Sequence, residues 1–507
     1  MAVHMSFTTE LAGFASSARK PPPALAEYAL MKEFESSGKF WLPGFDSHCV
    51  WGKVRYVPGG ATDLTLDDCL PPNGQYAVNL NLPEIHGRLY NGAPCVIRSA
   101  WGGVESFSGK EECFRTRLQS RLFLFGLDPQ AQDRFCGASI TFSHLNDWFD
   151  RPLDLSYEEN GFDTFVVNFR PDKQEAASHF RGSPFKLVLF CSRTIPSCPD
   201  NERLEFTYRY KVTILPERPQ TLDWHLALTS LLRELFMFLV GTGVYTLEIA
   251  AFAGDEPGRN IVHVFPCVTV PMLVRLDPHY FYSTHAKLRD HFQSLLDAWL
   301  SNSEILTVVR HTLSDLMTVD GTSPEAVFTR VVQTMEHFHG LICSGEHRYV
   351  RRSTWKHFAG WLDDHFLSCC QDAQPSQADE LLRAKDPLIG RIRGINSLSF
   401  RSRIRSLFEA VPPRQLMPMI DNPGDIPGFL DHFMPRLEAT RHYLTHFSPD
   451  QRERAFGSGE LEKPTLQCWS VLIFSLARFL GLSDELAGDL GLAARKSLFL
   501  VGTDAQL

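Results

Sequence analysis

The spacing of apolar residues changes near residue 275, and this change constrains the fold more than any other feature of the chain. Before it, short β-branched or alternating segments are separated by turn sequences such as Pro58-Gly59-Gly60. After it, apolar residues recur every three or four positions, as they do along one face of a helix. The sequence therefore predicts an α+β protein of several domains, with a β-rich N-terminal half, sandwich-like or barrel-like, followed by an all-α half.

The same spacing predicts the individual elements. Strands are expected at 53–57, 62–66, 95–99, 139–142, 164–169, 185–191, 204–214 and 261–270. One helix is expected among them at 222–240, where Thr221 or Asp223 can cap the first turn. Later helices are predicted around 288–299, 305–316, 327–342, 355–366, 402–410, 429–447 and 466–480, with a last one beginning at Asp484.

Composition limits the partners and the compartment. The net charge of −9 gives no global positive field, so any contact with nucleic acid requires a local basic patch. The twelve cysteines are scattered without a C-x-x-C motif, which is typical of buried thiols in a reducing compartment. No secretion signal is recognisable, and the apolar run 235–253 is interrupted by Gly241 and Gly243 and carries Glu248. We therefore expect a cytoplasmic protein without a membrane segment.

Positive charge gathers locally in the second half. The interval 383–405 carries seven basic residues and one acid, Asp386, and a second basic group surrounds Tyr349 and Trp355. Such patches can hold a polyanion, although a solvated surface without a ligand is an equally good interpretation. The candidate RNA-binding residues are Arg348, Arg351, Arg352, Lys356, Arg391, Arg393, Arg401, Arg403 and Arg405.

An arginine followed five positions later by a histidine occurs at Arg352–His357 and again at Arg441–His446. The combination suits phosphodiester cleavage, because a guanidinium neutralises charge on the phosphate and an imidazole transfers protons near neutral pH. On a straight helix this offset is about 140° of rotation, so the side chains converge only if the helix ends nearby or a second copy completes the site. Pro449 follows the second pair, so we expect the chain to turn at His446, and we prefer this pair. The first pair is better interpreted as a phosphate-contacting surface.

Histidines and cysteines gather between residues 337 and 370. Cys343 and His347 are one helical turn apart, as are His365 and Cys369, and this spacing suits tetrahedral zinc. Ordinary positions on two packed helices explain the spacing better, because zinc ligand pairs usually come with tighter turns. We expect no metal site, and zinc binding by these four residues is left as an open alternative.

The surroundings of the second pair resemble a known family. Residues 437–446 resemble the catalytic signature of HEPN ribonucleases, in which an arginine, a polar residue and three variable positions precede a histidine. Further marks resemble the ApeA-type HEPN proteins of bacterial abortive-infection defence: Phe40–Gly44, Thr334–His339 and Phe400–Ile404. The resemblance spans about 38–488. Two departures are His442, at a position that is often Asn, and Pro435, inside the expected catalytic helix.

The resemblance implies a division into four segments. These are a lead-in at 1–37, a β-rich ApeA-like sensor domain at 38–275, a helical linker region at 276–370 and a HEPN ribonuclease domain at 371–507. The expected fold class is thus an α+β multidomain protein with a β-rich domain followed by an all-α HEPN-type domain.

The resemblance also implies a metal-independent, cofactor-free endoribonuclease of anti-phage defence. His446 would act as general base or acid and Arg441 would stabilise charge on the phosphate, giving 2′,3′-cyclic phosphate and 5′-OH ends. His442 would orient the phosphate or a partner histidine, or be structural. The implied partners are RNA, with tRNA as one candidate, a second copy or higher homo-oligomer, and a phage-derived protein trigger that relieves restraint by the β-rich half.

Two other functions stay open from the sequence. One is a catalytically silent HEPN module that binds RNA or a nucleotide, which the intact Arg441 and His446 disfavour. The other is a non-enzymatic interaction protein whose β-rich half binds a partner while the helices oligomerise. The basic stretch disfavours this second alternative, because a plain scaffold does not need it.

Overall fold

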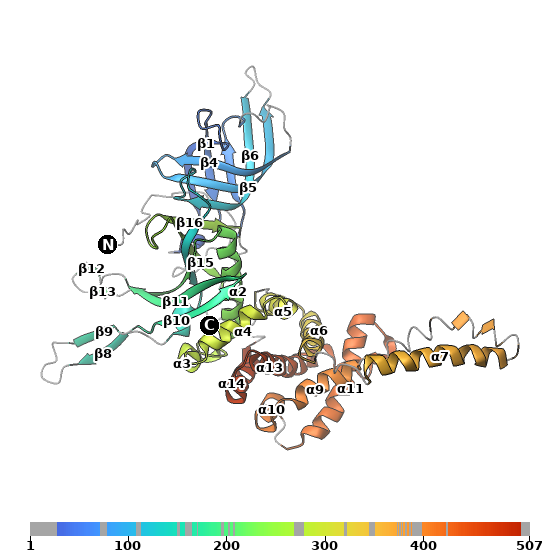
Figure 1. Cartoon of the computed structure of the whole chain (residues 1–507). Helices are drawn as coiled ribbons and strands as arrows, with labels where there is room; N and C mark the ends of the chain where they lie inside the picture. The colour runs from blue at the N-terminus through green and yellow to red at the C-terminus, as the bar shows by residue number, and fades with distance from the viewer. Residues whose placement is uncertain are drawn as a thin grey trace.

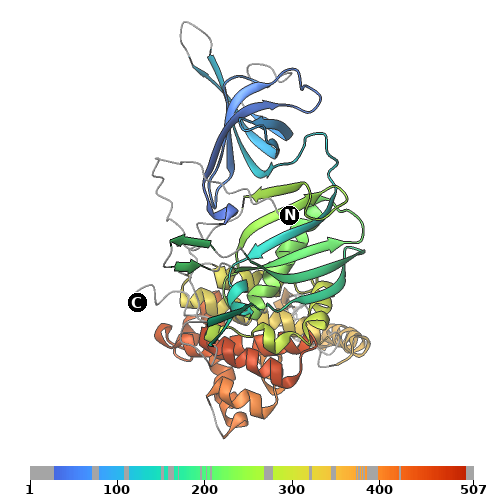
Figure 2. The same ribbon diagram turned by 90° about the vertical axis from the view of Figure 1, so that its left-hand side faces the viewer.

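The computed structural model describes residues 28–497 with several gaps. The gaps are 71–78, 108–112, 150–152, 158–164, 170, 194–196, 201–202, 206–207, 268–277, 319–321, 344–349, 373, 375–376, 378, 381–382, 385–386, 388–397 and 422–423. Most of the predicted lead-in lies outside the described residues. The rest forms a β-barrel, an open sheet and a helical bundle, and the open sheet lies between the other two in both views (Figures 1 and 2).

The barrel closes because its last strand pairs with two others. Its strands are β1 (Phe34–Trp41), β2 (Val50–Tyr56), β3 (Thr62–Leu66), β4 (Leu80–Leu89), β5 (Pro94–Phe107) and β6 (Cys113–Phe125). They run antiparallel in the order β6-β3-β2-β1-β4-β5, and β5 pairs back onto β6. Alternate side chains such as Phe40, Val54, Leu64 and Ile85 fill the interior. Closure removes the exposed strand edges of an open sheet.

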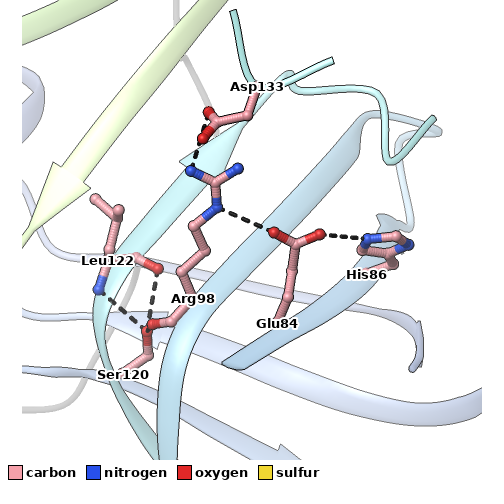
Figure 3. Close-up of polar contacts among 6 residues, drawn as sticks. All are labelled: Glu84, His86, Arg98, Ser120, Leu122 and Asp133. Carbon is pink, nitrogen blue, oxygen red and sulfur yellow. Dashed lines mark hydrogen bonds and ion pairs between the residues drawn. The ribbon is translucent and has the colours of Figure 1, made fainter. Parts of the chain in front are cut away.

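Polar contacts tie the barrel wall to the segment that leaves it (Figure 3). Glu84 of β4 accepts a hydrogen bond from Arg98 Nε of β5 at 3.1 Å and lies 2.7 Å from His86 Nε2. Arg98 Nη1 also donates to Asp133, beyond the end of β6, at 3.1 Å. Ser120 of β6 donates to the Arg98 carbonyl at 2.6 Å. The connection to the next sheet is therefore fixed to the barrel by charge.

The sheet continues outside the barrel through β16. Its further strands, in spatial order, are β16 (Ile261–Pro266), β15 (Thr246–Ala253), β7 (Phe135–Phe142), β14 (Tyr208–Pro216), β11 (Ser183–Arg193) and β10 (Gln174–Phe180). Helix α2 (Leu222–Val240) packs beside β7. As predicted, Thr221 caps it by accepting from the Trp224 amide, and Gly241 ends it at φ 78°. Shorter elements are α1 (Leu145–Trp148) and the hairpins β8 (Leu153–Tyr157)–β9 (Phe165–Phe169) and β12 (Ser197–Asp200)–β13 (Arg203–Glu205).

The second half is helical. Its helices are α3 (His285–Leu288), α4 (Phe292–Ser301), α5 (Thr307–Thr318), α6 (Pro324–Ile342), α7 (Arg352–Asp372), α9 (Phe400–Glu409), α10 (Pro413–Ile420), α11 (Ile426–His446), α12 (Pro449–Arg452), α13 (Glu462–Phe479) and α14 (Asp484–Ser497). Helix α13 is buried on nearly all sides and packs against α6, α9, α10 and α14. Helix α7 extends away from the bundle (Figure 1). The predicted fold class, a β-rich domain followed by an all-α region, is confirmed.

The packing is continuous across residue 275. The strands β7, β10, β11 and β14, most of α2 and the helical bundle share one hydrophobic core, while the barrel interior and the strands β15 and β16 share a second core. Trp299 of α4 donates to the Leu231 carbonyl of α2 at 2.9 Å. Tyr282 donates from its backbone N–H to the Val240 carbonyl at 3.3 Å, and its hydroxyl accepts from Trp469 of α13 at 2.8 Å. The change at 275 is therefore a change of secondary structure and not a break in the core.

A buried ion pair across this core gives a first prediction. Glu234 of α2 pairs with Arg310 of α5, and both side chains are nearly buried. Replacing Arg310→Met leaves the carboxylate without its cation, so we expect a loss of about 3–5 kcal/mol in the free energy of unfolding. The double variant Glu234→Leu/Arg310→Met should recover most of it, because no buried charge remains. Denaturant unfolding followed by tryptophan fluorescence tests this; equal destabilisation in the single and double variants would contradict it.

Candidate active site

Arg441, His442 and His446 lie in the last turns of α11. The Asp425 carboxylate caps the start of this helix by accepting from the Gly428 amide at 2.9 Å, and the helix runs through Pro435 to His446. It ends because Phe447 adopts a left-handed conformation with φ 51°. His446 therefore lies at the end of the helix, as predicted.

The expectation that the turn brings Arg441 and His446 together is wrong. Phe447 caps the helix, and Pro449 lies beyond this cap and begins α12, so neither residue bends α11 between Arg441 and His446. Because α11 is continuous, the two side chains keep a rotation of about 140°. His446 is exposed beside His442, with ring centroids 5.9 Å apart, whereas Arg441 faces α6 and α9. Within one chain the two groups point in different directions.

Arg441 is held between two other helices. Its Nη2 lies 3.4 Å from Oε2 of Glu336 on α6, and its guanidinium carbon lies 5.4 Å from the Phe400 ring centroid on α9. Its Nε is buried and has no hydrogen-bond partner among the described residues. The guanidinium is thus fixed by one carboxylate and one aromatic ring.

The other oxygen of the same carboxylate holds a second arginine. Arg403 of α9 donates from Nη1 to Glu336 Oε1 at 2.9 Å and from Nε to the Leu398 carbonyl at 2.9 Å. The side chains of Arg441, Arg403 and Glu336 are 23%, 25% and 22% exposed, so solvent reaches all three. Two guanidinium groups from different helices therefore meet at one carboxylate.

The neighbouring arginines of α9 are neutralised separately. Arg401 donates twice to Glu438 of α11, at 3.1 and 2.6 Å. Arg405 pairs with Glu409 at 2.7 Å and with Asp431 at 2.6 Å, and the bonds to these carboxylates raise the pKa of its guanidinium. Arg401 and Arg405 are therefore charge-balanced in the free protein. The sequence of the basic stretch could not predict this neutralisation, because Asp431 and Glu438 lie in α11.

The remaining candidates lie apart from this cluster or outside the described residues. Arg352 begins α7, and Arg351, Lys356 and His357 are exposed at its start. The same helix carries a row of aromatic rings, Trp355, Phe358 and Trp361, with successive centroids 5.3 and 5.9 Å apart. Arg348, Arg391 and Arg393 lie outside the described residues.

The histidines and cysteines do not form a cluster in the part of the chain that the structure describes. Cys343 Sγ lies 3.5 Å from His339 Nε2, and His365 Nδ1 lies 3.0 Å from the Trp361 carbonyl. Among the described residues, no group of three or more His, Cys, Asp or Glu side chains is placed to hold a metal ion. His347 and the side chain of Cys369 lie outside the described residues.

A hollow lies toward the other end of α11. Phe429, Phe433 and Phe456 form its apolar wall, and Arg436 and Glu460 lie at its edge. Arg436 donates to Glu460 at 2.9 Å, and this bond and the Gly457 amide hold the pKa of the Glu460 carboxyl below its usual value. The hollow is lined by the half of α11 that precedes Arg441, so it is separate from the arginine pair.

Comparison with protein families matches both halves of the chain. Residues 35–299 match the model described as ApeA N-terminal domain 1, and residues 331–486 match the Apea-like HEPN model. The chain belongs to the ApeA-type HEPN proteins. The family resemblance predicted from the sequence is thus confirmed, and HEPN domains are generally nucleases. No curated protein and no solved structure matches the chain.

The HEPN match includes the whole arginine cluster. It begins before Glu336 on α6, in the segment that the sequence assigned to a linker region, and it extends past His446. In this ApeA-type chain, Glu336, Arg403, Arg441 and His446 therefore belong to one matched domain. None of the described helices is both long and apolar enough to cross a membrane.

Proposed function

We propose that this ApeA-type HEPN protein is a cytoplasmic anti-phage endoribonuclease that cleaves RNA at Arg441 and His446 without a metal ion. The observation that carries the proposal is the intact pair on α11, inside the matched HEPN domain, with Arg441 fixed and partly exposed and His446 open to solvent. A silent HEPN module would need neither side chain.

The chemistry follows from these two groups. A ribose 2′-OH attacks the adjacent phosphorus while His446 accepts or donates the proton that moves. Arg441 neutralises the negative charge that grows on the phosphate oxygens. The products are a 2′,3′-cyclic phosphate and a 5′-OH end. His442 lies beside His446 and can orient its ring.

The geometry of α11 supports a second copy in the catalytic unit. Since Arg441 and His446 point in different directions from one continuous helix, a phosphate that contacts both needs a further chain. In a homodimer or higher homo-oligomer, His446 of one copy would work with Arg441 of another copy.

The barrel is the best candidate for binding a phage-derived trigger. Its outer face exposes Trp51 beside Lys39 and Trp101 beside Arg121. Aromatic and cationic side chains of this kind are common at protein-binding surfaces. The open sheet joins the barrel to the core of the bundle, so a change in the barrel can reach α13 through packed elements.

Removal of either catalytic group gives the test of the site. Arg441→Ala and His446→Ala should each lower the rate of RNA cleavage by about a hundredfold or more, because they remove charge stabilisation and proton transfer. Both proteins should remain folded, since His446 is exposed and Glu336 keeps Arg403. Cleavage of a labelled total RNA measures the rates. Arg352→Ala and His357→Ala are controls. If these two variants were inactive while the α11 variants kept their activity, the catalytic pair would be Arg352 and His357 instead.

Mixing inactive variants tests the second copy. If Arg441 and His446 cooperate between chains, Arg441→Ala and His446→Ala proteins that exchange subunits should regain part of the activity, since one intact pair forms in each mixed dimer. If the two groups cooperate within one chain, the mixture should stay inactive. The measurement is RNA cleavage after subunit exchange, with each variant alone as control.

Restraint by the β-rich half predicts a low basal activity. Purified full-length protein should cleave RNA slowly, and extract from phage-infected cells should accelerate it, whereas extract from uninfected cells should not. Each tenfold gain in the active population requires the trigger to prefer the active state by about 1.4 kcal/mol. Parallel reactions with the His446→Ala protein measure the cleavage by nucleases of the extract, and this rate is subtracted. Full activity without any extract would contradict the restraint.

A further inference from the structure

Glu336 brings together two arginines that the sequence assigned to different roles. Arg441 was expected in catalysis, whereas Arg403 was expected to contact the RNA backbone with the rest of the basic stretch. In the structure Arg403 and Arg441 occupy the two oxygens of the one Glu336 carboxylate, at 2.9 and 3.4 Å. We infer that Arg403 is a second phosphate-contacting residue of the active site and that Glu336 is the residue that positions both guanidinium groups. This inference rests on the proposed function.

The first argument is the number of donors that remain open. Arg403 uses Nε and Nη1, and Arg441 uses Nη2. Besides the buried Arg441 Nε, this leaves Arg403 Nη2 and Arg441 Nη1 without a hydrogen bond among the described residues. Both side chains are about one-quarter exposed. A phosphodiester has two non-bridging oxygens, and two adjacent guanidinium groups can each contact one of them.

The second argument is charge. One carboxylate between two guanidinium groups leaves the cluster with a net charge of about +1, so the cluster still attracts an anion. Without Glu336, the two cations would repel each other and separate. The carboxylate therefore allows two positive groups to stay close in the free protein, before RNA arrives.

The third argument is the contrast within α9. Arg401 donates twice to Glu438, and Arg405 is shared by Glu409 and Asp431, so both are neutralised by acids that do not contact Arg441. Arg403 is the arginine of α9 whose carboxylate partner also holds Arg441. Arg403 therefore differs from Arg401 and Arg405, because, among the described residues, only its carboxylate partner also contacts Arg441.

The fourth argument is how firmly Arg403 is held. Its Nε bond to the Leu398 carbonyl fixes the plane of the guanidinium relative to the start of α9. Arg441 has the Phe400 ring on one side, from the same helix start. Both groups are thus positioned by the first turn of α9 and by Glu336, and a phosphate would meet them without rearrangement of the backbone.

Steady-state kinetics of the full-length protein distinguish a role of Arg403 in the active site from a general contact with the RNA backbone. Arg403→Ala should lower kcat by about a hundredfold with a smaller change in KM, as for loss of one charge-stabilising donor. Arg401→Ala should act mainly on KM. Arg330→Ala is the matched control, because it removes an exposed arginine of α6 that pairs with Asp315 of α5 and not with Glu336, and it should leave kcat unchanged. An Arg403→Ala protein whose kcat equals that of Arg330→Ala would overturn the inference.

Substitutions of Glu336 test its positioning role separately. Glu336→Ala should lower kcat by about tenfold or more, and Glu336→Gln, which keeps one acceptor oxygen, should restore part of the loss. Faster cleavage by Glu336→Ala would overturn the positioning role, because it would mean that the carboxylate competes with the phosphate for the arginines.

Binding of inorganic phosphate tests the same cluster without RNA cleavage. Binding to the His446→Ala protein should broaden the ³¹P NMR signal of inorganic phosphate. Adding Arg403→Ala or Arg441→Ala should reduce this broadening, whereas adding Arg330→Ala should leave it unchanged. Failure of the proposed function would appear instead as an Arg441 and His446 pair that is dispensable for cleavage. Phosphate that binds Arg403→Ala and Arg330→Ala equally would overturn the role of Arg403 alone.

Discussion

The hydrophobic core shared by the open sheet and the helical bundle is the constraint on which the rest of the structure depends. Trp299 and Trp469 are completely buried within it. Trp299 donates its indole N–H across the junction to Leu231, and Trp469 donates to Tyr282, whose own backbone N–H is bonded across the junction to Val240. A buried tryptophan whose polar atom is satisfied contributes both apolar area and orientation. The two halves are therefore one packed body, and the core of the barrel continues into β15 and β16 of the open sheet.

This arrangement offers a physical route for the restraint proposed above. Helix α13 lies at the centre of the bundle and packs on α6 and α9, the helices that carry Glu336 and Arg403. A small shift of α13 would change the distance between the two guanidinium groups, because both depend on one carboxylate. A site built from three helices is sensitive to their relative positions in a way that a site on one helix is not. We propose this route from barrel to site as the physical basis of restraint.

The sequence predicted local features well and long-range ones poorly. The strand at 62–66 and the helix at 222–240 have the predicted bounds, because alternation and a capped apolar stripe are local signals. Strand β6 was missed, and its pairing with β3 joins segments far apart in sequence. Strand β4 was missed although it forms a hairpin with β5, because Pro83 and Gly87 interrupt its pattern. Helix α10 was missed because Pro413 and Pro418 interrupt its pattern.

The site shows the same division. Arg441 and His446 could be chosen from one motif and the break after it. Their relative direction could not, because Phe447 ends α11 only after the histidine. The pairing of Glu336 with Arg441 joins residues 105 positions apart, and no periodicity reports such a contact. Charge runs likewise say nothing about partners on other helices, as Arg401 and Arg405 demonstrate.

The chemistry of the cut ends tests the central claim most directly. Purified full-length protein, activated by extract from infected cells and then repurified, would be incubated with RNA in the presence of EDTA, and the new termini would be identified by their reactivity to ligases and phosphatases. The account predicts 2′,3′-cyclic phosphate and 5′-OH ends formed at the same rate with and without EDTA, and none from the His446→Ala protein. Ends bearing 3′-OH and 5′-phosphate, or cleavage abolished by EDTA, would contradict it.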